Sequence, residues 1–321
     1  MKLLHLPFAL CWLLFLSSCL PQAPSSRMQL ASQGAYSGAI DDLGTSAVVG
    51  SYLHGGSFWN LNKNARDFNW NHRQGYLTEI LYSDVSADGR YAITANYFNL
   101  VLWDTTTGKS VWFWSAPAKI EAVALSADGQ FALLGLADNS ALLFDIQNGG
   151  LLREFSHQGP VVSVALNTAA GIALTGSEDT TARLWNTRTG DLIREFKFSN
   201  QVPLVALSPS GQKALLVPAN ETAELWNLNA RKKIATLKTA NFRLYSGRFI
   251  GETRLLVGTT HRNIFEFDAT NGKKIKTWKL GTEGKQAFKS AIVLDIGWRQ
   301  GQLLAIGSNG YLYAFCQMKI C

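Results

Sequence analysis

The sequence repeats itself about every 41 residues, and this period constrains the fold more than any other feature. An aromatic residue closes a short apolar run once in each repeat, and the intervals between these aromatics are 44, 41, 41, 41, 41 and 48 residues. The seven aromatics are Trp59, Trp103, Phe144, Trp185, Trp226, Phe267 and Phe315. A repeat of this length is one supersecondary unit, which buries its apolar faces only against neighbouring copies.

Two turns divide each repeat into short β-prone runs. Asp or Asn follows most of the closing aromatics, and a glycine often comes four residues later, as in Asp104 to Gly108. An Asx side chain caps such a turn, and glycine supplies the positive φ that the turn needs. A second turn, such as Ser86-Ala87-Asp88-Gly89, separates two further apolar runs. The pattern predicts four antiparallel strands per repeat.

Seven such sheets predict an all-β, seven-bladed β-propeller, because sheets stacked around an axis bury faces that a single sheet leaves exposed. The last repeat, Ser290 to Phe315, contains only three strands. We expect the N-terminal segment Ser26 to Leu30 to supply the fourth strand and to close the ring, which removes an open seam. The propeller would then span residues 26–315, with residues 316–321 as a C-terminal tail.

The N-terminal segment has a different character. Lys2 precedes an apolar run from Leu3 to Phe15, and Leu16-Ser17-Ser18-Cys19 follows it. The run is shorter than the roughly 20 residues of a transmembrane helix, and the order of basic, apolar and small residues is typical of a secretory signal. The segment resembles a bacterial lipoprotein signal whose lipobox reads Leu-Ser-Ser-Cys. An ordinary secretory signal with an incidental cysteine is the alternative.

The lipoprotein resemblance implies that residues 1–18 are removed and that Cys19 receives a diacylglycerol and an acylated amino terminus. Residues 19–25 would form a lipidated tether, held to the membrane by acyl chains that contribute about 0.8 kcal/mol per buried CH₂. Leu20 is not the aspartate that favours inner-membrane retention in enteric lipoproteins. The resemblance therefore implies a protein of the outer membrane that faces the periplasm.

Cys316 and Cys321 are the other two cysteines of the predicted mature chain. In an oxidising periplasm they could form a disulfide, worth roughly 2 kcal/mol from loop entropy. Two free thiols at the end of the chain are the alternative, because the tail must fold back for the two sulfur atoms to meet.

The repeats resemble the WD40 family over about residues 26–315. The fourth repeat matches best, because His157, Thr175, Asp179 and Trp185 fall where that family has a buried structural hydrogen-bond tetrad. The Gly-His dipeptide of the family is missing throughout, and only His157 remains of it. The resemblance implies a noncatalytic platform that binds other proteins, in this case those of the bacterial cell envelope.

A second propeller class is the alternative. Residues 104–112 read DTTTGKSVW, which resembles the tryptophan-docking motif of quinoprotein-type propellers. That class includes lipid-anchored propellers of outer-membrane β-barrel assembly machinery. Only the second repeat carries the full pattern, so the WD40 interpretation is favoured over a quinoprotein-like assembly accessory or ligand-binding subunit.

The sequence offers no catalytic motif. His157 and Asp179 could be two thirds of a catalytic triad, but their spacing matches the structural tetrad, in which Thr175 is a hydrogen-bond link rather than a nucleophile. No Gly-x-Ser-x-Gly turn, P-loop or dinucleotide fingerprint is present. The histidines of the predicted mature chain lack metal-ligand spacing. We therefore expect no enzymatic activity, no metal and no cofactor.

Charge is distributed unevenly along the chain. Residues 229–289 contain 14 basic and 4 acidic residues, whereas residues 1–228 contain 14 basic and 18 acidic residues. The candidate basic surface consists of Lys232, Lys233, Lys273, Lys274 and Lys276, whose heads we expect in solvent. These lysines protect strand edges, or they form an electropositive flank that meets an acidic partner or anionic lipid headgroups. Nucleic acid is a poor partner for a periplasmic protein.

The fourth strand of the second repeat is unusually aromatic. Alignment with the fourth repeat makes Val111 and Trp114 the inward pair and places Trp112 and Phe113 where that repeat has charged residues. We expect an apolar docking patch for a partner protein. Its members would be Trp112, Phe113, Phe68 and Trp70. Burial of Trp112 against the next blade is the alternative.

The connection between the sixth and seventh repeats is seven residues longer than the standard step. Its segment Gly281 to Gln286 has no periodicity and is a weaker candidate binding loop. We expect a monomeric propeller.

Overall fold

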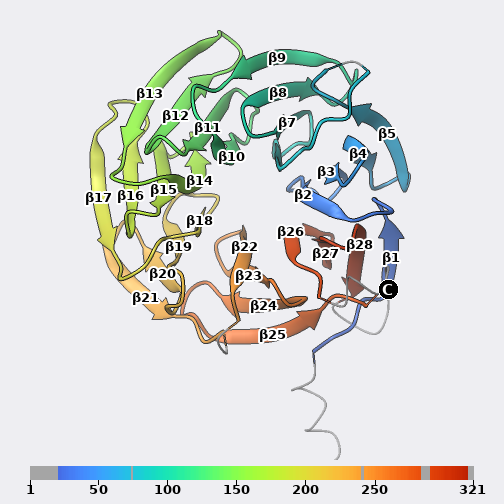
Figure 1. Cartoon of the computed structure of the whole chain (residues 1–321). Coiled ribbons are helices and arrows are strands. Elements are labelled where there is room, and N and C mark those ends of the chain that lie inside the picture. Colours follow the sequence, from blue (N-terminus) through green and yellow to red (C-terminus); the bar gives the residue numbers. More distant parts are fainter. Residues whose placement is uncertain (1–20, 74, 240–241, 283–289, 317–321) are drawn as a thin grey trace, which may run out of the picture.

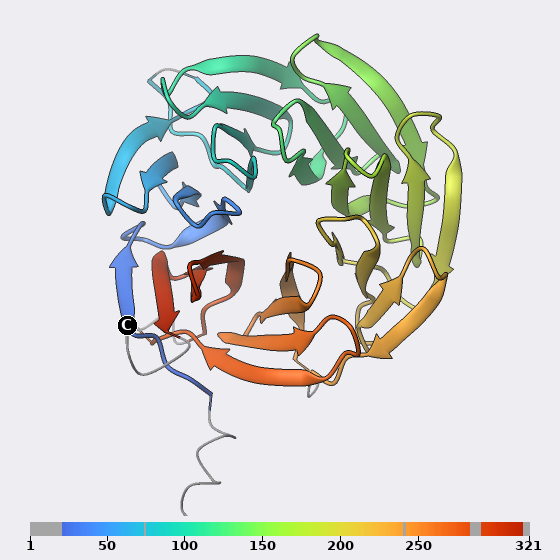
Figure 2. The same cartoon turned by 180° about the vertical axis from the view of Figure 1, so that it is seen from behind.

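The computed structural model describes residues 21–73, 75–239, 242–282 and 290–316. Within these ranges the chain forms 28 strands, which assemble into seven four-stranded antiparallel sheets around a central axis (Figure 1). The view from behind shows the same ring (Figure 2). The predicted all-β, seven-bladed propeller is confirmed. None of the described residues forms a helix long and apolar enough to cross a membrane.

Each blade has its inner strand beside the axis and its outer strand at the perimeter, and in blades 1 to 6 the strands follow chain order from inside to outside. Blade 1 contains β2 (Ala35–Ile40), β3 (Ser46–Ser51), β4 (Gly55–Asn60) and β5 (Ala65–Trp70). Blade 2 contains β6 (Tyr82–Val85), β7 (Tyr91–Ala95), β8 (Asn99–Asp104) and β9 (Ser110–Ser115). Blade 3 contains β10 (Ile120–Leu125), β11 (Phe131–Leu136), β12 (Ser140–Asp145) and β13 (Gly150–Ser156). Blade 4 contains β14 (Val161–Asn167), β15 (Ile172–Ser177), β16 (Thr181–Asn186) and β17 (Leu192–Lys197).

The last three blades have the same four-stranded plan. Blade 5 contains β18 (Leu204–Leu207), β19 (Lys213–Val217), β20 (Glu224–Asn227) and β21 (Lys232–Thr236). Blade 6 contains β22 (Leu244–Ile250), β23 (Arg254–Thr259), β24 (Asn263–Asp268) and β25 (Lys274–Lys279). Blade 7 contains, from inside to outside, β26 (Val293–Arg299), β27 (Gln302–Gly307), β28 (Tyr311–Cys316) and β1 (Ser26–Gln29).

The N-terminal strand closes the ring as predicted. β1 pairs antiparallel with β28, with Met28 opposite Leu312. The backbone N–H groups of Leu30 and Ala31 then both donate to the carbonyl oxygen of Gly310, at 2.8 and 3.0 Å. The outer strand of blade 7 therefore comes from the opposite end of the chain from its other three strands.

The described part of the predicted tether lies along the perimeter of the ring. Gln22 forms a parallel bridge with Trp278 of β25. Its N–H donates to the carbonyl of Thr277 and its carbonyl accepts from Lys279, both at 2.9 Å. Ser25 donates through its N–H and its hydroxyl to the carbonyl of Ala314 in blade 7. Residues 21–25 are thus fixed across the seam between blades 6 and 7, whereas residues 1–20, including Cys19, lie outside the described residues.

The turns that follow the closing aromatics form as predicted. The side-chain oxygen of Asp104 accepts the N–H groups of Thr106 and Thr107 at 2.8 and 3.0 Å. The same cap recurs in later blades at Asp145, Asn186, Asn227 and Asp268. Gly108, at φ 71°, completes the turn in blade 2.

The apolar core is divided into seven clusters, and each cluster contains residues from two neighbouring blades. The cluster between blades 4 and 5, for example, joins Leu174 and Phe196 to Val205 and Leu216. Serine hydroxyls add direct links between inner regions of adjacent blades, as where Ser163 donates to the carbonyl of Val202 at 2.9 Å. A blade is therefore stabilised mainly by its two neighbours.

Ring closure predicts that replacing Gly310 lowers the free energy of unfolding strongly. This residue has φ 84°, and an added Cβ would collide with the carbonyl oxygen of Ala31 beside the closing strand. Gly149 also has positive φ, 70°, but nothing lies within 4 Å of its Cβ position. We expect Gly149→Ala to cost about 1 kcal/mol in unfolding free energy and Gly310→Ala to cost more than about 3 kcal/mol. Equilibrium denaturation measures both, and equal losses would contradict the closure mechanism.

Candidate functional site

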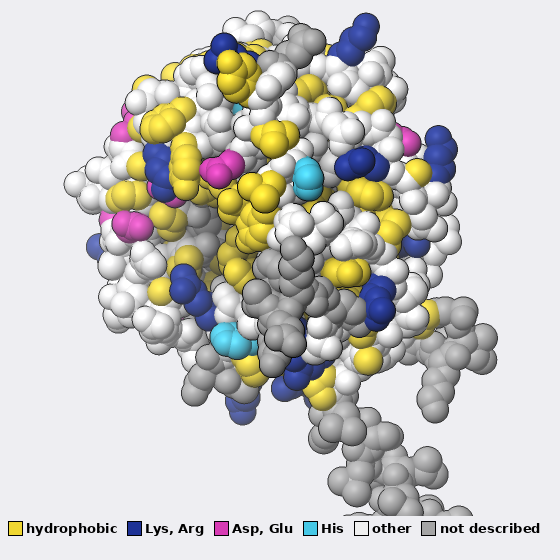
Figure 3. All heavy atoms as spheres, turned by 45° about the vertical axis from the view of Figure 1, so that its right-hand side comes forward, with side chains coloured by type: hydrophobic (Ala, Val, Ile, Leu, Met, Phe, Trp, Pro, Cys, Tyr) yellow, Lys and Arg dark blue, Asp and Glu magenta, His cyan; other side chains and the backbone are white. Residues whose placement is uncertain are grey.

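One face of the ring carries large exposed aromatic side chains. It is formed by the connections between the second and third strands of each blade and by the connections between blades. Tyr76, Tyr97 and Phe98 lie in these connections and are 59%, 44% and 52% exposed. Tyr245, which is 45% exposed, lies near the start of the inner strand β22 and lines the axial channel. We call this surface the aromatic face. Every described histidine also lies in its connections. Figure 3 shows hydrophobic side chains on the surface near histidines.

Polar contacts hold part of the aromatic face in place. The Tyr82 hydroxyl donates to Glu121 at 3.4 Å, and Lys119 pairs with the same carboxylate at 2.8 Å. The Lys119 ammonium also lies 5.0 Å from the ring centre of Tyr97. Burial raises the pKa of Tyr82, with Glu121 adding to the effect, so the phenol stays a neutral donor. Rigid aromatic rings with polar edges suit recognition of protein surfaces.

The axial channel contains an arginine and two aspartates from the inner strands. It forms a cavity of about 480 Å³, and Arg248 of β22, Asp295 of β26 and Asp84 of β6 line it. The Arg248 guanidinium lies 3.6 Å from the carboxylate of Asp295. Asp295 also accepts the N–H of Ile40 in blade 1 at 2.7 Å, and Asp84 accepts the N–H of Leu125 in blade 3 at 2.8 Å. These carboxylates link neighbouring blades around the axis.

Burial raises the pKa of Asp295, and it raises the pKa of Asp84 to about 6. Each carboxylate also accepts backbone N–H bonds, which lower its pKa but do not offset the effect of burial. This cluster was not among the residues predicted from the sequence. The signal in the sequence was an ionisable residue within an inner strand that is otherwise made of small or apolar residues, as in the YSDV of β6.

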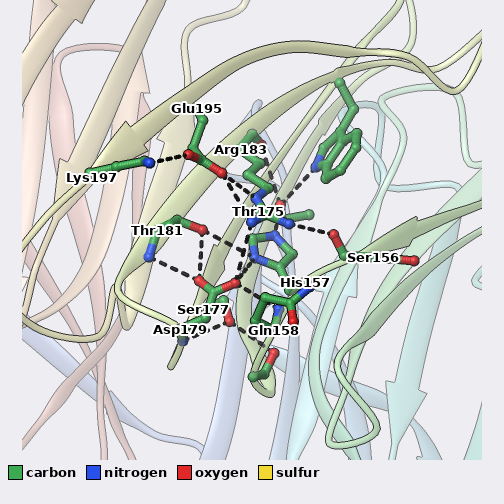
Figure 4. Close-up of polar contacts among 12 residues, drawn as sticks. Ser156, His157, Gln158, Thr175, Ser177, Asp179, Thr181, Arg183, Glu195 and Lys197 are labelled. Atoms are coloured by element: carbon green, nitrogen blue, oxygen red, sulfur yellow. Dashed lines mark hydrogen bonds and ion pairs between the residues drawn. The ribbon is translucent and has the colours of Figure 1, made fainter.

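The four residues predicted as a tetrad lie together inside blade 4, and Figure 4 labels three of them, His157, Thr175 and Asp179. His157 Nδ1 lies 2.9 Å from the Asp179 carboxylate, and His157 Nε2 lies 2.7 Å from the Thr175 hydroxyl. The Trp185 indole N–H donates to that hydroxyl at 2.9 Å. With a proton on Nδ1, the histidine donates to Asp179 and accepts from Thr175, so all four side chains are satisfied.

Further donors surround Asp179. Its carboxylate accepts the N–H of Gln158 at 2.8 Å and the hydroxyl of Thr181 at 2.6 Å. Partial burial raises the pKa of Asp179, but these hydrogen bonds and His157 outweigh it and lower the pKa to about 2. Burial lowers the pKa of His157 despite the carboxylate beside it. Thr175 is fully buried and His157 is 4% exposed, so the tetrad connects β-strands and offers no access to a substrate.

A related network in blade 2 was missed by the sequence analysis. His72 Nε2 lies 2.9 Å from the hydroxyl of Thr94, which also accepts the indole N–H of Trp103 at 2.8 Å. Tyr97 occupies the position six residues before Trp103, where blade 4 has its aspartate. His72 Nδ1 is buried and has no hydrogen-bond partner among the described residues. Burial lowers the pKa of His72 to about 4.

The predicted aromatic docking patch is wrong. Trp70 is 2% exposed and stacks on Trp103 of blade 2 at 4.9 Å, and Phe68 packs beside it with a ring separation of 6.3 Å. Trp112 packs against Phe144 of blade 3 at 5.7 Å, which is the interblade packing considered as the alternative.

The inward pair was also misassigned, because the register of β9 shifts at Val111 and side chains alternate only from Trp112 to Ser115. Trp112 and Trp114 point toward blade 3, while Val111 and Phe113 are 53% and 54% exposed. Of the predicted patch, only Phe113 is exposed.

The candidate basic surface is exposed in part. Lys232, Lys233, Lys273 and Lys274 are exposed at the perimeter of blades 5 and 6, and Lys233 pairs with Glu224 at 2.8 Å. Lys276 differs from the expectation, because its ammonium lies 3.9 Å from the ring centre of Trp278 and it is partly buried.

Two further predictions fall at the edges of the described chain. Cys316 is buried at the end of β28 and takes part in a disulfide bond, whereas Cys321 lies outside the described residues. Of the candidate loop 281–286, only Gly281 and Thr282 are described.

Among the described residues, no three His, Cys, Asp or Glu side chains gather closely enough to hold a metal ion.

Residues 149–186 match the family model of the WD domain, G-beta repeat (WD40). This span contains β13 and the three inner strands of blade 4, and therefore the whole tetrad. No curated protein matches the sequence. The repeat match and the seven-bladed ring together support a WD40-type propeller.

The buried His72 predicts a pH dependence of stability. In the unfolded chain a histidine takes up its proton near pH 6.5, whereas the native His72 does so only near pH 4. Protons therefore bind preferentially to the unfolded state between these values, and the contribution of His72 to stability is lost as the pH falls from 6.5 to 4. The loss amounts to at most about 3 kcal/mol.

We expect the slope of unfolding free energy against pH, measured from pH 6.5 to 4, to be shallower in His72→Gln than in the unchanged protein. The same substitution at His54 is the control, because that side chain is already in contact with solvent in the folded protein. Parallel slopes for the unchanged protein and His72→Gln would contradict the assignment.

Proposed function

We propose that this protein is a noncatalytic scaffold of the bacterial cell envelope, anchored by lipid at Cys19 to the outer membrane and facing the periplasm. A WD40-type propeller acts in general as a platform for protein interactions, which supports the scaffold role. The observation that carries the proposal is the aromatic face, where Tyr76, Tyr97 and Phe98 are exposed in the connections before and within blade 2. Exposed aromatic side chains in one region are typical of protein-binding surfaces.

The chemistry of the described residues favours binding over catalysis. The histidine and threonine of blade 4 are buried and form a fully bonded network with the aspartate. Asp84 and Asp295 in the axial channel bind backbone N–H groups of neighbouring blades. Both networks stabilise a fixed shape, which lowers the entropic cost of presenting the aromatic face to a partner.

A photo-crosslinking amino acid tests the aromatic face directly. We expect its incorporation at Tyr97 or Phe98 in intact cells to give discrete crosslinked proteins that mass spectrometry identifies. Leu43 is 59% exposed in the turn between β2 and β3, on the opposite face, and provides the control position. The same adducts at all three positions, or adducts only at Leu43, would contradict the proposed binding surface.

The lipid anchor makes a separate prediction. Intact mass spectrometry of the membrane fraction should find a chain that begins at Cys19 and carries acyl groups, and Cys19→Ala should abolish both the cleavage and the acylation. Cys11→Ala is the matched control, because Cys11 lies within the predicted signal and should have no effect. A non-acylated chain cleaved at another residue would establish an ordinary secretory signal instead.

A further inference from the structure

A basic groove lies beneath the tether at the perimeter of the ring. Its volume is about 380 Å³, and it lies between residues 21–27, Arg262 and residues 279–282. Arg27, Arg262 and Lys279 contribute three positive charges to its lining, and no acidic side chain lines it among the described residues. An anion in this groove would meet cations from both β1 of blade 7 and blade 6.

The tether fixes where a lipid anchor would meet the ring. Gln22 is hydrogen-bonded into the edge of β25, next to Lys279. Cys19 precedes Gln22 by three residues, a span of at most about 11 Å of extended chain. Acyl chains on Cys19 would therefore enter a bilayer beside this groove, a step that rests on the proposed lipid anchor. Figure 1 shows the chain joining the ring at this perimeter, close to β25 and β1.

The same edge carries the exposed part of the basic surface. Lys273 and Lys274 are exposed at the start of β25, and Lys232 and Lys233 are exposed on β21 of blade 5. Ile275 is 56% exposed between these charges, so an apolar side chain accompanies them. Cations around an apolar side chain match the interfacial region of an anionic bilayer.

We propose that the perimeter of blades 5 and 6, together with the tether, is a membrane-docking edge, and that its groove receives the phosphate of an anionic lipid headgroup. An acidic protein is a weaker occupant, because an anchor at Cys19 brings the bilayer itself to this edge. The ring then stands on its edge at the membrane, and the aromatic face is directed along the membrane plane toward neighbouring proteins.

Lysine footprinting tests the docking edge with the lipidated full chain. The protein is reconstituted into vesicles of phosphatidylcholine alone or with 30% phosphatidylglycerol, and acetylation of each lysine is followed by mass spectrometry. We expect acetylation of Lys273, Lys274 and Lys279 to be at least about fivefold slower on the anionic vesicles. Lys63 and Lys109, exposed in blades 1 and 2, are internal controls and should react equally on both. The difference should shrink at high salt.

Charge reversal identifies the contribution of the groove. The double variant Arg262→Glu, Lys279→Glu should lose most of the protection of Lys273 and Lys274, whereas Lys63→Glu, Lys109→Glu changes the net charge equally and should retain it. Thermal unfolding establishes that both variants are folded. A groove variant that is folded and still fully protected would overturn the role of the groove.

Three other results would overturn the proposal. Equal protection on both kinds of vesicle would mean that the anchor alone holds the edge at the bilayer. Protection by inorganic phosphate without protection by anionic vesicles would make the groove a site for free anions. Absence of protection on either vesicle would exclude the edge as a docking surface, whether or not Cys19 is acylated. Acylation is read separately from the intact mass, so failure of the anchor and failure of the docking edge are distinguishable.

Discussion

The structure depends on the burial of each blade against the next. All seven apolar clusters are shared between neighbours, so a single sheet has no core of its own. Stability in such an assembly is a sum of interface contributions, and a closed ring contains one more interface than an open row of the same blades. The pairing of β1 with β28 therefore supports every other contact, because it fixes the blade that completes the ring.

Hydrogen bonds between blades reinforce these apolar interfaces at a few positions. Ser37, Ser163 and Ser246 each donate a hydroxyl to a carbonyl of the following blade. Asp84 and Asp295 accept N–H groups across other interfaces. The tetrad of blade 4 acts within one blade and holds its strands and connection together. Each link satisfies a buried polar group that would otherwise destabilise the ring by about 1–3 kcal/mol.

Much of the fold could be predicted from the sequence, because the repeat length, the Asx turns and the three-stranded last unit each point to one architecture. The tetrad could be located for the same reason, since a fixed spacing connects Asp179 to Trp185. The aromatic patch was wrong because Trp70 and Trp112 pack against the adjacent blade, and an alignment of one repeat with another contains no information about contacts between blades. The aromatic face was missed because Tyr76, Tyr97 and Phe98 come from connections that differ between repeats.

The shared final blade has a consequence for how the chain folds during synthesis. β1 is made first, but its partner β28 emerges only after the intervening blades, so residues 26–29 have no strand to pair with for most of translation. Contacts separated by this much chain carry a large entropic cost and form slowly. Blade 7 is consequently the last to assemble, and until then the nascent protein has two unprotected sheet faces at which chaperones or other copies of the chain can bind.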